Sequence, residues 1–170
     1  LEFTGGGGKI IAFVTAGTEN GDISEAAGTV SLNGFQGAHQ TNISGSSDTT
    51  IKEGTVISTT DILYKQNHPQ CKISDTENSK AVYGVFISWD GDSTDTVNDI
   101  LVAQTGTFVI RIHKDETVSK GDLIQSKGDG TGKVQADDIM RASTVAKVLS
   151  TTKIETYSDG SYIVPCSLHC

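Results

Sequence analysis

The chain has 170 residues, of which 35% are hydrophobic and 6% aromatic, and its formal net charge is −8. This length suits one domain or two small subdomains. Because 21 acidic residues outnumber 13 basic ones and no Lys/Arg cluster occurs, the composition argues against binding to a nucleic-acid backbone. No apolar run is long enough to span a membrane, so membrane insertion is not expected.

Residues 1–8, LEFTGGGG, lack the basic and apolar regions of a signal peptide. We interpret them as a linker from a preceding region, and we expect the chain to be the C-terminal piece of a longer protein. Residues 9–15 form an apolar run that predicts a strand, and Asn20-Gly21 after it is a dipeptide typical of hairpin turns. Residues 29–32 predict a further strand, which ends at a second such dipeptide, Asn33-Gly34.

Farther along the chain, polar and Pro-containing stretches alternate with short apolar ones. They predict a loop at 41–50, strands at 55–57 and 62–64, and a break at 67–70. Residues 81–89, AVYGVFISW, are the most apolar segment, which predicts a strand buried on both faces with Gly84 at a close backbone approach.

The acidic loop 90–99 separates that strand from two more, predicted at 100–104 and 107–113 and divided at Gly106. The remaining predicted elements are turns at 120–122, 127–130, 131–132 and 158–160, and strands at 144–149 and 162–168, where Pro165 favours an edge or a bulge.

Residues 136–148 allow a second interpretation. Ile139, Ala142 and Ala146 would share one face of a helix, but the β-branched residues Thr144 and Val145 favour the strand.

Short strands with turns about every 8–12 residues are typical of sandwiches and barrels. We therefore predict an all-β fold of about a dozen short, mainly antiparallel strands, in a sandwich or barrel-like arrangement. The predicted domains are the linker 1–8, an N-terminal β subdomain 9–70 and a C-terminal β subdomain 71–170, the last two alternatively forming one continuous domain. Residues 82–89 and 107–112 are the predicted core, and the low hydrophobic content suggests that neighbouring chains contribute to stability.

Four carboxylates gather in the acidic loop, at Asp90, Asp92, Asp95 and Asp99. Closely spaced oxygen ligands are what Ca²⁺ requires, so the four residues are candidate metal ligands. The loop lacks the Gly and Glu positions of an EF-hand, and the residues favour a solvated acidic loop instead. We expect no cofactor other than this candidate Ca²⁺.

The three cysteines are an odd number for a disulfide framework, which favours reduced thiols. With two histidines they form a conceivable zinc set: His68, Cys71, Cys166, His169 and Cys170. Along a strand, however, Cys166 and Cys170 would lie about 13 Å apart at ~3.3 Å per residue, which favours buried or edge thiols.

Other candidate motifs have simpler interpretations. Residues 5–9, GGGGK, lack the Ser or Thr and the helix that a phosphate-binding loop needs. His39 and Asp48 could be combined with a serine as a catalytic set, but no nucleophile motif accompanies them, and a structural role is favoured for His39. Asn42-Ile43-Ser44 matches the glycosylation pattern, which has little meaning without a secretory signal.

Tyr83, Phe86 and Trp89 lie in the apolar segment 81–89. Exposed aromatic side chains could bind sugar, but their alternation and apolar neighbours favour packing in the core.

Several short motifs follow one another in an order that is more specific than any one of them. They are Phe35-x-Gly37-x-His39, Lys52-x-Gly54-Thr55-Val56, Cys71-Lys72-Ile73-Ser74-Asp75-Thr76, Ser79-Lys80-x-Val82-Tyr83-Gly84-Val85-Phe86, Gly121-Asp122-Leu123-Ile124, Gly128-Asp129-Gly130-Thr131, Gln135-x-Asp137-Asp138-Ile139 and Asp159-Gly160-Ser161-Tyr162-x-Val164-Pro165-Cys166. In this order they resemble a C-terminal module of tailed-phage tail fibres, tailspikes and appendages. The module is similar to the peptidase G2 (intramolecular chaperone autoproteolytic cleavage) type of domain.

The resemblance extends from about residue 9 to residue 170 and implies a β-rich domain at or near the end of a trimeric fibre. It implies roles in trimer assembly, capping or host attachment. Some relatives cleave themselves, but no cleavage nucleophile can be assigned to a residue of this chain, and the helices of the associated chaperone are not found in its sequence.

The expected function is therefore that of a virion structural protein without turnover chemistry, made in the host cytoplasm and located in the tail fibre or appendage. Its expected partners are two further copies of itself, other virion tail proteins and a host cell-surface glycan or protein. The alternatives are a self-processing domain, in which autoproteolysis would be the only enzyme-like activity, and a glycan- or receptor-binding adhesin module.

Overall fold

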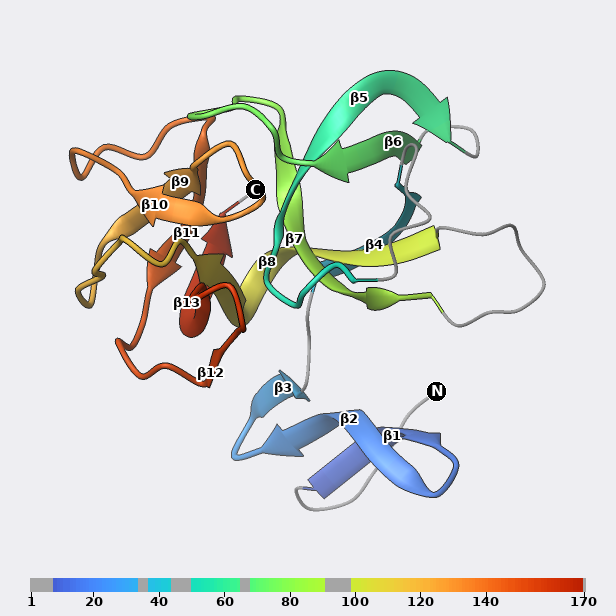
Figure 1. Ribbon diagram of the computed structural model, residues 1–170. Helices are drawn as coiled ribbons and strands as arrows, with labels where there is room; N and C mark the ends of the chain where they lie inside the picture. The colour runs from blue at the N-terminus through green and yellow to red at the C-terminus, as the bar shows by residue number, and fades with distance from the viewer. Residues whose placement is uncertain (1–7, 34–36, 44–49, 65–67, 91–98, 170) are drawn as a thin grey trace. The chain divides into compact units, whose positions relative to one another are not determined.

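The computed structural model describes residues 8–33, 37–43, 50–64, 68–90 and 99–169, which form strands and turns without any helix (Figure 1). The predicted all-β class is confirmed. The chain divides into two compact units, Leu1–Phe35 and Gln36–Cys170. No helix within the described ranges could cross a membrane.

The first unit contains a three-stranded antiparallel sheet in the order β1 (Gly8–Thr15), β2 (Thr18–Ala26) and β3 (Thr29–Asn33). Its two hairpins turn at Ala16-Gly17 and Ala27-Gly28, where both residues of each pair have positive φ. Two-residue loops of this kind match the twist of the flanking strands.

The predicted turn at Asn20-Gly21 was wrong, because this dipeptide lies inside β2. Both residues of Ala16-Gly17 adopt left-handed conformations, with φ of 50° and 80°, and Thr15 pairs with Thr18 across the loop. The register that follows pairs Ile11 with Ile23 and so places apolar residues on one face of the sheet.

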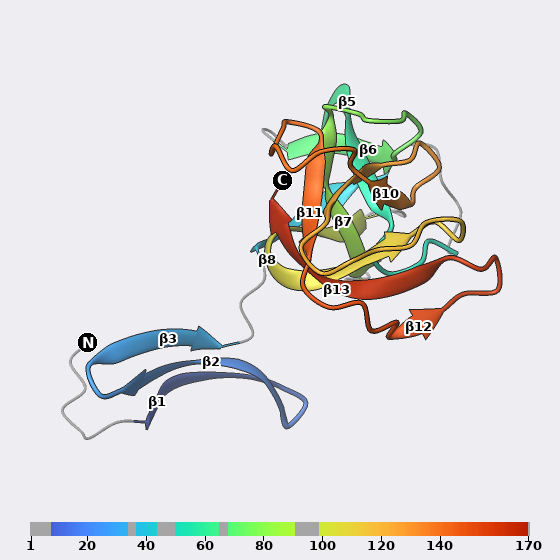
Figure 2. The same cartoon turned by 90° about the vertical axis from the view of Figure 1, so that its left-hand side faces the viewer.

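The second unit is built on one ten-stranded sheet. Its strands are β4 (Gly37–Asn42), β5 (Val56–Tyr64), β6 (His68–Ile73), β7 (Val82–Trp89), β8 (Asp99–Ile112), β9 (Leu123–Ser126), β10 (Gly132–Val134), β11 (Thr144–Val148), β12 (Glu155–Thr156) and β13 (Tyr162–His169). Strands β13, β11, β9, β10 and β8 pair in that order, and β13 also pairs with β8, so these five strands form a closed barrel. Figure 2 shows β13 alongside β8, where the barrel closes. The predicted barrel-like, mainly antiparallel arrangement is confirmed, since only β8 and β10 pair in parallel among the described strands.

Strand β8 connects the barrel to the rest of the sheet. Instead of the two strands predicted on either side of Gly106, it is one strand of 14 residues. Gly106 has φ of 94° and lies within the strand. Residues before it pair with β4 and β7, whereas residues from 105 onward pair with β13.

The two units divide at residue 35, whereas the predicted subdomain boundary at 70/71 falls inside β6. Strands β5 and β6 belong to the large sheet because β5 pairs with β7. Pro69 lies within β6, opposite Leu63, and not at a break. Proline is tolerated there because β6 is the last strand in the order of the sheet.

Segment 144–148 is a strand, as the β-branched residues favoured, and residues 136–143 are turns and bends. Pro165 lies in β13, which has neighbours on both sides. Its carbonyl accepts a hydrogen bond from the Leu149 N–H, just past the end of β11, and β12 begins its pairing at Ile163. The missing N–H of Pro165 thus falls where the neighbour of β13 changes from β11 to β12.

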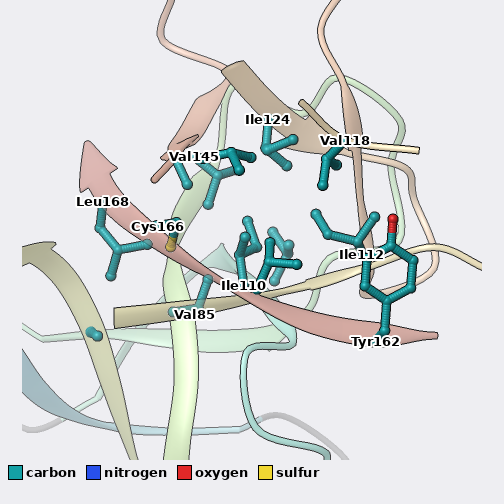
Figure 3. Close-up of a cluster of buried hydrophobic side chains, with 14 residues drawn as sticks. Val85, Ile110, Ile112, Val118, Ile124, Val145, Tyr162, Cys166 and Leu168 are labelled. Carbon is teal, nitrogen blue, oxygen red and sulfur yellow. The ribbon is translucent and has the colours of Figure 1, made fainter. Parts of the chain in front are cut away.

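The core lies in two clusters. The first fills the barrel, where side chains of β8 and β13 meet those of β9 and β11 (Figure 3). The second packs on the remaining part of the sheet and consists of Ile43, Ile57, Cys71, Phe86, Ile100 and Val102. Val85 belongs to the first cluster and its neighbour Phe86 to the second, which confirms that β7 is buried on both faces.

Candidate functional site

A concavity lined by charged side chains lies beside the C-terminal half of β8. It consists of two hollows of about 280 Å³ and about 230 Å³, which share Arg111, Asp129 and Asp159. His113 and Lys114 line the first hollow, and Lys52, Thr55 and two isoleucines line the second. We call the two together the Arg111 hollow.

Two turns of the same design form part of its wall, Asp129-Gly130-Thr131 and Asp159-Gly160-Ser161. In each turn the Asp Oδ1 accepts hydrogen bonds from the backbone N–H and the hydroxyl of the residue two positions later. The distances are 2.9 and 2.5 Å in the first turn and 3.0 and 2.6 Å in the second. Both middle glycines have positive φ, 79° and 85°, which L-residues rarely adopt. The local sequence therefore fixes one carboxylate oxygen of each Asp and leaves Oδ2 facing other groups.

Arg111 lies between the turns and is held from three directions. Its Nε donates to Ser161 Oγ at 2.7 Å, one Nη donates to Thr55 Oγ1 at 3.3 Å, and the other donates to Asp159 Oδ2. Lys52 Nζ donates to the same Asp159 oxygen at 2.7 Å. Hydrogen bonds from Lys52 and Ser161, together with the charge of Arg111, hold the pKa of Asp159 far below its usual range.

His113 directly follows the end of β8, two residues after Arg111, and has a defined tautomer. Its Nδ1 accepts a hydrogen bond from the Asp115 N–H at 3.2 Å, so the neutral ring carries its proton on Nε2. Nε2 lies 3.6 Å from Asp129 Oδ2, which is too long for a direct hydrogen bond. Burial alone would raise the pKa of Asp129, but hydrogen bonds from Thr131 and the charges of His113 and Arg111 bring it below its usual value. Asp129 Oδ2 is thus an ionised acceptor that lies near the Nε2 donor of His113 without being hydrogen-bonded to it.

The candidate calcium ligands lie elsewhere, and Asp92 and Asp95 are outside the described residues. Asp90 and Asp99 lie at the base of the acidic loop, where the Asp90 N–H donates to the Asp99 carbonyl at 2.9 Å. Gln40 donates to the Asp90 carboxylate, and Asn42 donates to that of Asp99 at 3.2 Å. Within the described ranges no three His, Cys, Asp or Glu side chains gather as a metal site would require, and calcium in this loop stays a prediction.

The zinc set is not assembled among the described residues. Cys71 and Cys166 are buried and belong to different core clusters, and Cys170 lies outside the described residues. His68 and His169 lie exposed on β6 and β13.

The remaining sequence candidates do not form sites either. His39 lies exposed on β4, whereas Asp48 and Ser44 fall outside the described part of the chain, as do residues 5–7 of GGGGK. Gly8 and Lys9 begin strand β1 and do not precede a helix. Phe86 is buried against Trp89 in an edge-to-face contact with 5.8 Å between ring centroids, so core packing is confirmed for this pair.

The Arg111 hollow was not identified from the sequence. A signal for it is the repeated tripeptide Asp-Gly-Thr/Ser, at 129–131 and 159–161, which we interpret from the sequence as turns and as parts of the ordered motifs, and not as a site. Residues 30 positions apart could not be placed at one hollow without knowledge of how β8 and β13 pair.

We expect both buried thiols to resist modification. Burial is the main reason that the pKa of Cys71 rises to about 11, despite a nearby Thr41 hydroxyl. In the Cys170→Ser variant, which removes the third thiol, a chromogenic disulfide reagent at pH 8 should react with no thiol in the native protein and with both after unfolding in urea. Rapid reaction of one native thiol would contradict the burial of that cysteine.

No family model matches the chain, and a search of curated proteins found no match.

Proposed function

We propose that the chain is a virion structural protein, the C-terminal domain of a phage tail fibre, tailspike or appendage. It assembles as a homotrimer, acts in assembly or capping with other tail proteins, and contributes to host attachment. The ordered short motifs support this proposal, as does the all-β fold, which suits a fibre end. Its place would be the virion, after synthesis in the host cytoplasm.

The apolar face of the first unit carries the proposal. The register of β1, β2 and β3 places Ile11, Phe13, Ile23 and Val30 on one face together with Glu25, because cross-strand partners and alternate residues share a face. Ile11, Phe13 and Val30 are 40%, 54% and 65% exposed. The opposite face carries Ala12, Asp22, Ser24 and Ser31.

A sheet of this size needs a partner for that face. Among the side chains of this unit whose exposure the structure describes, no large apolar one is buried, and small sheets are stable only when an apolar face is covered. Two further copies of the chain would cover it in a homotrimer, which agrees with the low hydrophobic content of the sequence.

Light scattering across a dilution series tests the proposal. We expect a mass of three chains that does not change on dilution. A stable monomer would overturn the trimeric fibre-domain proposal and favour an independent binding module.

Replacing Phe13 with Ser should weaken the trimer. Loss of a buried Phe removes roughly 1.5–3 kcal/mol of transfer free energy from each chain, so the variant should dissociate at concentrations where the wild type stays trimeric. Ala12→Ser is the matched control, because its side chain lies on the opposite face of β1. Analytical ultracentrifugation would measure both, and equal dissociation of the two variants would show that this face is not the interface.

Glycan binding is a second candidate function, and the specific observation that favours it is the Arg111 hollow.

A further inference from the structure

We propose that the Arg111 hollow is a carbohydrate-binding site that takes a neutral saccharide with neighbouring hydroxyl groups. The inference deepens the host-attachment part of the proposed function and rests on that function for its biological role. Its chemistry rests on the residues of the hollow alone.

The size of the hollow suits a ligand of one or two rings. Its parts of about 280 and about 230 Å³ are contiguous at Arg111, Asp129 and Asp159. Small-molecule pockets usually measure roughly 300–1,000 Å³, so each part by itself is slightly smaller than such a pocket. The hollow therefore offers two adjacent subsites, with Arg111, Asp129 and Asp159 between them.

The spacing of donor and acceptor at His113 and Asp129 matches a hydroxyl group. His113 Nε2–H and Asp129 Oδ2 lie 3.6 Å apart and both line the first part. A ligand hydroxyl can accept from Nε2 and donate to Oδ2, whereas neither side chain satisfies the other directly. The Asp115 N–H fixes the ring tautomer, and Thr131 fixes the carboxylate, so the pair is arranged before a ligand binds.

Arg111 adds further donors in the shared region. Its three hydrogen bonds described above use three of its five N–H donors, and Asp159 Oδ2 already accepts from both Arg111 and Lys52. Because Asp159 Oδ1 is held by Ser161, this carboxylate has a fixed orientation as well. The two remaining donors of Arg111, next to the His113–Asp129 pair, suit neighbouring hydroxyls on a sugar ring.

The charges of the lining argue against an ionic ligand. Lys52, Arg111 and Lys114 are positive, and Asp129 and Asp159 are negative. An anion would meet two carboxylates, and a cation would meet Arg111 and Lys52 at short range. A neutral polar ligand can use both signs as hydrogen-bond partners.

The second part also offers apolar contact. Ile51 and Ile73 line it, and both are half-buried. They provide a surface for the C–H groups of a sugar ring, next to the polar groups that would bind its hydroxyls.

The test uses the full chain and two readouts. Amide chemical shifts are followed by NMR during titration with D-glucose, D-galactose, D-mannose and N-acetyl-D-glucosamine, each up to about 50 mM, well above a weak Kd of about 1 mM. Labelled protein is also applied to an array of neutral and acidic glycans. We expect at least one neutral sugar to shift amides of residues 111–114, 129–131 and 159–161, and the array to show neutral glycans bound.

Asp129→Asn is the diagnostic variant, since Asn keeps the Oδ1 acceptor for Thr131 and loses the charged Oδ2. We expect it to weaken binding about tenfold or more. His113→Ala, which leaves both turns in place, should weaken binding to a similar degree. Asp75→Asn is the matched control, because Asp75 is an exposed, ion-paired Asp outside the lining, and its affinity should be unchanged. Thermal melting verifies that all three variants fold.

Three outcomes overturn the inference: no shift and no array signal, binding that both Asp129→Asn and His113→Ala retain, or binding of acidic glycans only. The mass from light scattering distinguishes failure of the carbohydrate-site proposal from failure of the trimeric fibre-domain proposal. A trimer that binds no sugar overturns only the carbohydrate site, and a monomer that binds sugar through Asp129 overturns only the fibre assembly.

Discussion

Replacing Gly84 with Ala is expected to destabilise the protein by more than about 4 kcal/mol and to prevent folding of the large sheet under ordinary conditions. A Cβ at this position would lie 2.2 Å from the Ala103 carbonyl oxygen and 2.7 Å from Val102 Cγ1. The nearest atom belongs to the backbone of β8, which pairs with β7 at Val85 and Ala103 and cannot withdraw without breaking that pairing. Urea unfolding followed by circular dichroism measures the change.

Gly121→Ala is the control for this prediction. Gly121 also has positive φ, 97°, but no atom lies within 4 Å of its Cβ position. The Gly121→Ala substitution should lower the free energy of unfolding only by the backbone strain, about 1–2 kcal/mol. A Gly84→Ala variant as stable as Gly121→Ala would contradict the close approach of β7 and β8.

Replacing Phe86 with Ala should cost about 3–5 kcal/mol. Phe86 is 3% exposed and packs in the second core cluster, with its ring edge-to-face against Trp89. Truncation would leave a cavity between β7 and the strands that cover it, in addition to the lost transfer free energy. Urea unfolding followed by circular dichroism measures this loss of unfolding free energy.

Leu63→Ala is the matched control, since Leu63 is 69% exposed on β5. Its effect should stay within about 0.5 kcal/mol. A Phe86→Ala loss under about 1 kcal/mol, accompanied by weaker glycan binding, would instead make Phe86 a contact residue.

Local patterns in the sequence were sufficient for about half of the strands. The continuous apolar run 81–89 predicted a strand buried on both faces, and Val85 and Phe86 belong to the two separate clusters. The β-branched pair Thr144 and Val145 correctly favoured a strand over a helix. Such patterns work because side chains alternate within a few residues of one strand.

Turn and boundary assignments failed where two local signals competed. Asn20-Gly21 is a strong turn dipeptide, but Ala16-Gly17 forms the hairpin, and the resulting register aligns Ile11 with Ile23. Gly106 suggested a break, yet β8 continues through it because β4, β7 and β13 pair along its length. Pairing with distant strands outweighed the local preference of single residues.

The sequence by itself determined the all-β class, about half of the strands and the two Asp-Gly turns, because alternation and turn chemistry act over a few neighbouring residues. Only the tertiary structure decided that β8 and β13 close a barrel, and that Lys52, Arg111, Asp129 and Asp159 meet at one hollow. These residues lie up to 107 positions apart. Their meeting depends on strand order and register, which arise from burial summed over the whole sheet and not from any local pattern.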